Sequence, residues 1–232
     1  MFFDEHPEFL ETSSTAAGTR RLNQRHVAMI EENQQVLRQA RVLDIASHDG
    51  RWSFAALKAG ASHVTGIEGR SHLVQNANKT FADKGIDSSR FDFVHGDAHD
   101  VLTQGVGSFD VVMCLGFVYH TLRYVELFSG IRATGARHVI IDTRVHLDEK
   151  RVIAVHSNPV QKEGLAIEDR FSYKGQTLVG RPSMAALEHM LGAYGYEIAS
   201  QPDWSRILGP DANPENRYLT GARVTLLAVS RD

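Results

Sequence analysis

Three acidic residues follow or end successive strand-like segments in the first half of the chain, and each could recognise one part of a nucleoside derivative. Asp44 lies in the first segment, where it can receive an ammonium group or orient the loop that follows. Glu68 follows the second segment and is placed to bridge the hydroxyls of a ribose. Asp97 follows the third and could accept a hydrogen bond from an adenine amino group. Together they predict a nucleoside-binding site.

The loop after Asp44 leads from a hydrophobic segment into a helix and carries a single glycine, Gly50. Such a junction presents backbone N–H groups to a ligand, and glycine lets the backbone come close to it. We expect Ala46 and His48 to line the ligand with their backbone atoms. The residues expected to contact the ligand are Asp44, Ala46, His48, Gly50, Glu68, Asp97, Ala98 and Cys114.

A second acidic group could hold a metal ion. Asp142 ends the strand-like segment 137–142, and the adjacent Glu168 and Asp169 follow in the less regular region 143–182. Three carboxylates from a strand end and a neighbouring loop can offer oxygen ligands to a hard divalent cation that keeps open water positions. An acidic surface loop is the alternative interpretation.

Two histidines are candidates for removing a proton from an acceptor. His146 lies four residues after Asp142, where a neutral imidazole could take the proton of a hydroxyl that a bound metal has acidified. His120 follows the predicted fourth strand and is the second candidate. Because the chain contains 12 histidines, a structural or surface role is the alternative for both. We expect His146 to be the base.

Aromatic and polar side chains in region 143–182 and in the loop 201–221 could recognise the acceptor. An aromatic ring can pack on the apolar face of a pyranose, although core or lid packing is the alternative for the tryptophan. The candidate acceptor-binding residues are Tyr173, Trp204, Arg206 and Tyr218.

Alternating strands and helices must position these residues. The expected strands are residues 41–46, 63–67, 91–94, 109–115, 137–142, 196–200 and 223–229, and the main helices are 21–40, 54–59, 71–84, 118–134 and 183–194. The right-handed crossover rule places the first five strands in one parallel sheet, with ligand sites at their carboxyl ends. The last two strands, which follow one another across a loop, predict an antiparallel hairpin at the sheet edge.

The predicted architecture is therefore α/β. It is a Rossmann-like, doubly wound, mostly parallel seven-stranded sheet with an antiparallel terminal hairpin and an N-terminal helical lid. Residues 1–40 form the lid, and residues 41–232 form the main domain, which includes a substrate- and metal-binding insertion near 143–182.

Composition narrows the range of partners. With 25 Lys and Arg against 28 Asp and Glu, the net charge of −3 provides no bulk positive field, so we expect no nucleic-acid partner. One cysteine cannot form an internal disulfide, and no apolar run reaches about 18 residues. The beginning of the sequence lacks a signal-peptide pattern. We expect a cytoplasmic protein without membrane contact that acts on a small-molecule or oligosaccharide acceptor, and a homodimer stays open.

Over roughly residues 20–232 the sequence resembles the class I S-adenosylmethionine-dependent methyltransferases. That family has an acidic residue followed by Gly-x-Gly-x-Gly in its first loop, where this chain keeps Asp44 and Gly50. The segment 109–116 resembles the fourth family motif. The resemblance implies that S-adenosylmethionine is the cofactor, held by Asp44, Glu68 and Asp97, and that the reaction is methyl transfer.

The acidic pattern further resembles metal-dependent macrolide-sugar and aminocoumarin-sugar O-methyltransferases. This similarity makes Asp142, Glu168 and Asp169 candidate ligands for Mg²⁺ or Mn²⁺. It also implies a base a few residues after the first ligand, close to His146. The stretch 44–53 is similar to a sugar 1-O-methyltransferase acting on methylmannose polysaccharide precursors, which implies a mannoside acceptor and a role in polysaccharide biosynthesis.

Two other functions stay open. The segment 115–120 resembles the fourth-motif region of methyltransferase-fold enzymes that modify the wobble uridine of tRNA, although net acidity counts against an RNA substrate. Alternatively, the reduced glycine content of the first loop fits a catalytically silent, cofactor-binding partner subunit.

Overall fold

Strands rich in buried aliphatic residues form the centre of the molecule. The computed structural model describes residues 1–12, 18–162 and 164–231. In β1 (Arg41–Ile45), Val42, Leu43 and Ile45 are fully buried, as expected for a parallel strand that is covered on both faces. The remaining strands of this sheet are β2 (His63–Glu68), β3 (Phe91–His95), β4 (Val111–Leu115), β5 (His138–Arg144), β8 (Tyr196–Ser200) and β9 (Arg223–Ser230).

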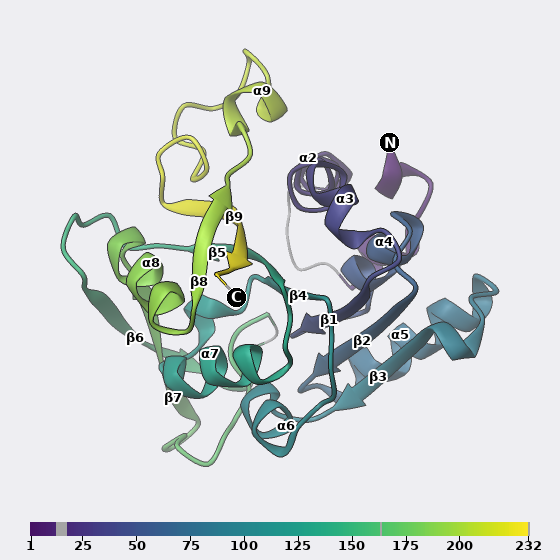
Figure 1. Ribbon diagram of the computed structural model, residues 1–232, viewed down its shortest axis with the longest axis horizontal. Coiled ribbons are helices and arrows are strands. Elements are labelled where there is room, and N and C mark those ends of the chain that lie inside the picture. The colour runs from purple at the N-terminus through teal and green to yellow at the C-terminus, as the bar shows by residue number, and fades with distance from the viewer. Residues whose placement is uncertain (13–17, 163, 232) are drawn as a thin grey trace.

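The seven strands are ordered β3-β2-β1-β4-β5-β9-β8 (Figure 1). The first five are parallel to one another, whereas β9 lies antiparallel between β5 and β8. The predicted Rossmann-like architecture is therefore confirmed, including the antiparallel terminal pair. Asp142 faces Thr225 across the β5–β9 register, and Arg144 faces Arg223. This pairing carries side chains from the C-terminal part of the chain to the carboxyl end of β5.

Helices cover both faces of the sheet, and successive strand residues alternate between the two cores. Val112 and Cys114 of β4 pack towards α6 (Ala98–Gln104), α7 (Tyr124–Ala133) and α8 (Met184–Ala193). Val111 and Met113 pack into the second core, which includes residues of α2 (Gly18–Met29), α4 (Arg51–Lys58) and α5 (Ser71–Asp83). None of the helices in the described ranges is long and apolar enough to cross a membrane.

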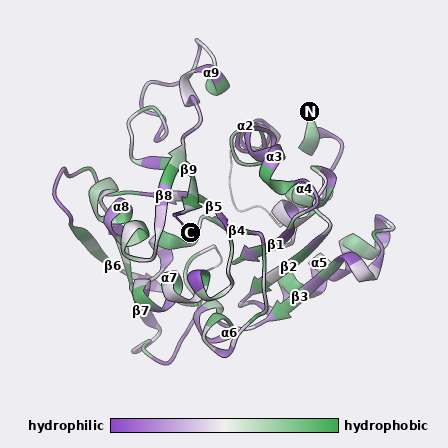
Figure 2. Ribbon diagram, in the orientation of Figure 1, coloured by the Kyte–Doolittle hydropathy of each residue, from purple (hydrophilic) through white to green (hydrophobic). Residues whose placement is uncertain are grey.

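Where the sequence predicted one helix over 21–40, the structure has three elements, which are α2, η2 (Glu31–Asn33) and α3 (Gln34–Leu37). Two further short elements, η1 (Phe2–Asp4) and α1 (Glu8–Glu11), precede them. The Asn33 side chain donates to the carbonyls of Ala28 and Met29, and so binds the last turn of α2. Phe3 packs edge-on against Trp52 of α4 at 5.3 Å between ring centroids. This contact fixes the segment to the second core. Figure 2 shows α2 as a largely hydrophilic helix.

Region 143–182 folds into a separate two-stranded antiparallel sheet, β6 (Ile153–Pro159) and β7 (Gln176–Pro182). The loop between these strands returns to the main sheet, because the Arg70 guanidinium donates to the Leu165 carbonyl at 2.9 Å. The remaining short elements are η3 (Ser88–Arg90), η4 (Val118–His120) and α9 (Trp204–Leu208). The expected helix over 118–134 is divided into η4 and α7 at Thr121, whose hydroxyl accepts from the Arg123 N–H.

Candidate functional site

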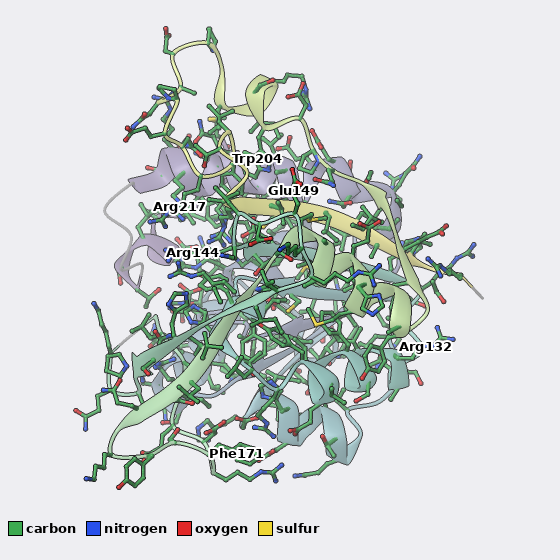
Figure 3. The ribbon with its side chains drawn as sticks, turned by 90° about the vertical axis from the view of Figure 1, so that its left-hand side faces the viewer. Arg132, Arg144, Glu149, Phe171, Trp204 and Arg217 are labelled. Carbon is green, nitrogen blue, oxygen red and sulfur yellow. The ribbon has the colours of Figure 1, made fainter. Side chains whose placement is uncertain are left out.

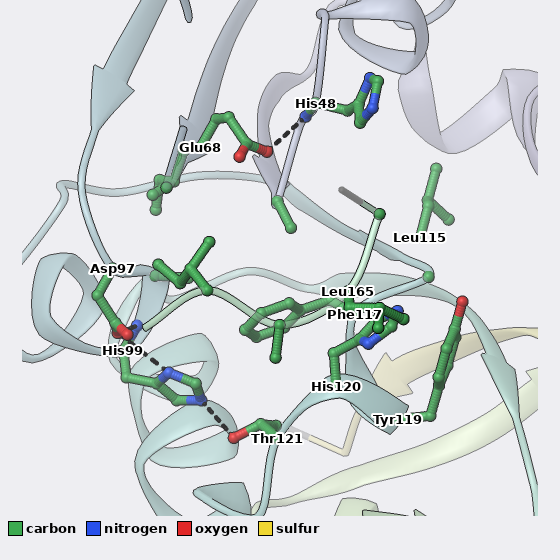
Figure 4. A pocket seen from close by; sticks show the side chains of 18 of the residues that line it. His48, Glu68, Asp97, His99, Leu115, Phe117, Tyr119, His120, Thr121 and Leu165 are labelled. Carbon is green, nitrogen blue, oxygen red and sulfur yellow. Dashed lines mark hydrogen bonds and ion pairs between the residues drawn. The ribbon is translucent and has the colours of Figure 1, made fainter. Parts of the chain in front are cut away.

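A cavity of about 740 Å³ lies at the carboxyl ends of the parallel strands. The first loop and Glu68 form one side, and Asp97 and Ala98 lie at the start of α6. Residues 115–117 and 119–123, at and after the end of β4, form the floor, and the loop that contains Leu165 also lines the cavity (Figure 4). The volume is within the range of pockets that hold drug-sized molecules.

The first loop keeps a glycine-type backbone without the expected glycines. Ala46 has φ +56° and His48 has φ +57°, both in the left-handed region that glycine adopts without cost. The Ser47 N–H donates to the Ile67 carbonyl at 2.9 Å, and the His48 N–H donates to Glu68 Oε2 at 3.0 Å. These bonds to β2 hold the strained conformation. Ala46 and His48 both line the cavity.

Three residues expected to contact the ligand lie behind the cavity wall. Asp44 is buried beneath the loop, where its Oδ2 accepts from the Ser53 hydroxyl at 2.7 Å. Burial raises the pKa of Asp44 to about 7. Gly50 packs against the Phe93 ring, since a Cβ there would lie 2.8 Å from it. Cys114 is fully buried in the core, and burial raises its pKa to about 12. None of the three lines the cavity.

Glu68 and Asp97 do line the cavity. Glu68 is only 5% exposed, and its two oxygens accept from the His48 and Arg70 N–H groups. Asp97 caps α6 by accepting from the N–H groups of His99 and Asp100. All hydrogen bonds to Asp97 within the described residues reach Oδ1, which leaves Oδ2 for a ligand. Although burial opposes ionisation, His99 and Arg123 lower the pKa of Asp97 to about 2.

A second group of polar side chains occupies the other end of the cavity. Tyr119 and His120 belong to η4, immediately after β4. The guanidinium of Arg144 lies 5.2 Å from the Tyr119 ring centroid, and that of Arg223 lies 5.5 Å from it. Burial, and then Arg144 and Arg223, lower the pKa of His120 to about 4. At neutral pH the imidazole is therefore uncharged.

Asp142 is fully buried and saturated with hydrogen-bond donors, which overturns its prediction as a metal ligand. Its Oδ1 accepts from Arg223 Nε at 2.8 Å and from Arg25 Nη2 at 3.0 Å. Its Oδ2 accepts from the hydroxyls of Tyr218 at 2.9 Å and Thr225 at 2.7 Å. Against the cost of burial, the two guanidiniums hold the pKa of Asp142 well below its usual range.

The other two expected metal ligands lie elsewhere. Glu168 is exposed, and Asp169 Oδ1 accepts from the Phe171 N–H and the Ser172 hydroxyl, both at 3.0 Å. Asp169 Oδ2 lies 3.7 Å from Arg123. Within residues 1–12, 18–162 and 164–231, no group of three or more His, Cys, Asp or Glu side chains is arranged to hold a metal. The predicted Mg²⁺ or Mn²⁺ trio is not assembled.

The structure separates the two candidate bases. His146 is exposed and does not line the cavity, and its backbone N–H donates to the Pro182 carbonyl. His120 does line the cavity, and its Nδ1 lies 3.5 Å from Asn158 Nδ2. The histidine that sequence reasoning placed second is thus the one that shares the cavity with Glu68 and Asp97.

The predicted acceptor-binding residues are dispersed. Tyr173 is exposed, and Arg206 forms an ion pair with Glu32 on the surface. Trp204 and Tyr218 stack with their ring centroids 3.5 Å apart and line a second cavity of about 550 Å³. Three arginines line both cavities: Arg21, Arg25 and Arg223.

Sequence reasoning missed these arginines, together with Arg144 and Tyr119. One signal was present. Arg21 and Arg25 are four residues apart on one helix without acidic residues beside them, a spacing that places both on one face. The positions of Arg144 and Arg223 depend on the pairing of β5 with β9, which joins distant parts of the chain.

Comparison with known proteins agrees with this geometry. Residues 42–134 match the family model of a methyltransferase domain. The N-terminal domain of EvdMO1, solved in the presence of SAH and D-fucose, is 14% identical with a TM-score of 0.60, covering 94% of this chain and 84% of that one. The magnesium protoporphyrin IX methyltransferase from Synechocystis PCC 6803, with bound SAM, is 17% identical with a TM-score of 0.58, covering 99% and 93%.

The 1,6-didemethyltoxoflavin-N1-methyltransferase from Burkholderia thailandensis is 16% identical with a TM-score of 0.60, covering 94% of this chain and 80% of that one. A comparison with curated protein sequences finds no match. The structure combines this strand order with a first loop of left-handed residues and with acidic residues at the end of β2 and after β3. The chain therefore has the fold of the class I S-adenosylmethionine-dependent methyltransferases, with residues 42–134 matching their methyltransferase domain.

Proposed function

We propose that this protein transfers a methyl group from S-adenosylmethionine to a hydroxyl oxygen of a small, sugar-like acceptor. The observation that carries the proposal is the composition of one cavity. Its first end presents the carboxylates of Glu68 and Asp97, and its second end presents the uncharged imidazole of His120. In this proposal, one cavity serves both cofactor recognition and proton removal.

The residues at the first end fit the cofactor. Each Glu68 oxygen accepts one backbone N–H and keeps a further lone pair for a ribose hydroxyl. Asp97 Oδ2 can accept from the adenine amino group, and Ile67 and Leu115 offer apolar contacts in the cavity lining. The ammonium group of the cofactor would not reach Asp44, because that carboxylate is buried behind the loop. Instead, Asp44 holds the start of α4 through Ser53.

Bound S-adenosylmethionine would supply an electrophilic methyl group. The acceptor hydroxyl must lose its proton as the new bond forms, and a positioned base assists that loss. With a pKa of about 4, His120 is unprotonated at neutral pH and has a lone pair for this proton. Asn158 contacts the ring and can orient it. We assign the base to His120 in place of His146.

A sugar-like acceptor is supported by a structural relative, because the N-terminal domain of EvdMO1 was crystallised in the presence of D-fucose. The second cavity, with the stacked Trp204 and Tyr218, offers additional room beside the acceptor end. An acceptor longer than one sugar could extend into it.

Calorimetry with S-adenosylhomocysteine tests the cofactor site. We expect Glu68→Gln to weaken binding roughly 10-fold to 100-fold, as for the loss of a charged hydrogen-bond acceptor worth about 1.5–3 kcal/mol. The exposed Glu149→Gln variant is the control and should bind as the unmodified protein does. Transfer of a labelled methyl group to a panel of monosaccharides then tests the reaction. A folded protein that does not bind S-adenosylhomocysteine would refute the proposal.

A further inference from the structure

The acceptor end of the cavity carries more positive charge than its carboxylates balance. Four guanidiniums line it, those of Arg21, Arg25, Arg144 and Arg223. Asp142 is the carboxylate that pairs with them, and it contacts Arg25 and Arg223. In the part of the chain that the structure describes, Arg21 and Arg144 have no carboxylate within ion-pair distance.

The unpaired guanidiniums are partly withdrawn from water. Arg144 is half-buried, and its Nε is fully buried with no hydrogen-bond partner among the described residues; the same is true of Arg25 Nε. Burial, followed by repulsion from Arg25 and Arg223, lowers the pKa of Arg21. Burial also lowers the pKa of Arg144, with repulsion from Arg217, Arg223 and Arg181. Partly buried cations without counter-ions are costly, and an anion would relieve that cost.

The guanidiniums converge from three elements onto the floor of the cavity. Arg21 and Arg25 lie one turn apart on α2, while Arg144 and Arg223 face each other across β5 and β9. A Cβ on Gly116 would lie 3.7 Å from Arg223 Nη2, so this group stands directly beside the loop after β4. Figure 3 shows Arg144 and Arg217 on one side of the molecule, between Trp204 and Phe171.

We infer that Arg21 and Arg144 bind an anionic group of the acceptor, a carboxylate or a phosphate, while the neighbouring His120 faces its hydroxyl. The inference rests on the proposed function and specifies its substrate class. Guanidinium groups bind both anions through paired, charge-assisted N–H donors, whereas an uncharged sugar accepts from the same donors without the charge. Arg25 and Arg223 stay bound to Asp142 and contribute their field and their free N–H groups.

Two matched pairs of sugars test the inference in protein saturated with S-adenosylhomocysteine. D-Glucuronate is compared with D-glucose to probe a carboxylate, and D-mannose 6-phosphate with D-mannose to probe a phosphate. We expect calorimetry to show at least one charged sugar binding 10-fold or more tighter than its neutral partner. Arg144→Gln and Arg21→Gln should each reduce that preference about 10-fold, and the surface variant Arg206→Gln should keep it.

Two measurements distinguish a failure of the anionic subsite from a failure of the proposed function. S-Adenosylhomocysteine affinity should be the same in Arg144→Gln and Arg21→Gln as in the unmodified protein, and the melting temperature should not fall, since each change removes like-charge repulsion. Equal binding of charged and neutral sugars, or retention of the preference in both variants, would overturn the anionic subsite while leaving the proposed function standing. Loss of S-adenosylhomocysteine binding in the unmodified protein would instead refute the proposed function.

Discussion

Replacing Asp142 by asparagine should destabilise the protein strongly, although the new side chain has nearly the same shape. The carboxylate is 0% exposed and accepts from two guanidiniums and two hydroxyls. The amide would keep one acceptor oxygen but would leave Arg25 and Arg223 without a counter-ion among other arginines. Breaking a buried ion pair from one side costs about 3–5 kcal/mol. For a chain of this size, such a loss lowers the melting temperature by roughly 6–20 °C.

Urea denaturation followed by circular dichroism measures this change in the free energy of unfolding. Asp83→Asn is the control, since Asp83 pairs with Lys79 on the surface, where such a pair contributes little. The pH dependence adds a second check. Because the folded-state pKa of Asp142 is lowered, its stabilisation is complete above the unfolded pKa of about 4 and is lost as the pH falls through the folded value.

A change of less than about 1 kcal/mol in the free energy of unfolding of Asp142→Asn would refute this reasoning, because removing one partner of a buried ion pair should cost more than that. The same variant discriminates the ion-pair role from the metal-ligand role expected from sequence. A metal ligand would make the melting temperature of the unmodified protein sensitive to EDTA. We expect no such sensitivity, since the carboxylate already has four donors.

Three further predictions concern the site and its supports. Because the pKa of Asp44 is raised to about 7, this residue favours folding below pH 4 and loses that contribution as the pH rises through 7. Urea unfolding should therefore show Asp44→Asn gaining roughly 2–3 kcal/mol relative to the unmodified protein between pH 5 and pH 8. A difference that does not change with pH would contradict this. His120→Gln should lower the single-turnover methyl-transfer rate about 100-fold without changing S-adenosylhomocysteine affinity, and an unchanged rate would remove His120 as the base. Gly130→Ala should destabilise the protein by about 1–3 kcal/mol in thermal unfolding, although alanine has the better helix propensity, because the added Cβ would lie 2.7 Å from Leu102 Cβ. A stabilised variant would show that α6 and α7 can separate freely.

The centre of the sheet could be predicted because β1, β2, β4 and β5 are short runs of buried residues, which are recognisable without their partners. The β1 strand, with Val42, Leu43 and Ile45 buried, differs by one residue from its predicted range. By contrast, β7 was missed. It contains Gly180 and Pro182, which interrupt a strand pattern, and it is held as a strand by pairing with β6.

The candidate site could be predicted only where each residue acts from its own strand end. Glu68 and Asp97 are of this kind, and both line the cavity. Asp142 was expected to end a strand but lies within β5, and its environment comes from Arg25 on α2 and Arg223 on β9, near opposite ends of the chain. Sequence alone cannot distinguish a metal-binding carboxylate from one that pairs with guanidiniums, because the paired arginines come from distant parts of the chain. Long-range packing also decides that His120 lines the cavity and that His146 does not.

The left-handed conformations of Ala46 and His48 change what the first loop presents to the cavity. A glycine at position 48 would show the ligand only a hydrogen atom, whereas this chain places an imidazole there, 3.4 Å from Asp49 and 3.3 Å from Arg51. The residue therefore occupies space that a glycine loop leaves open. Together with Gly50 at φ +79°, the loop therefore keeps three left-handed positions while glycine occupies one of them.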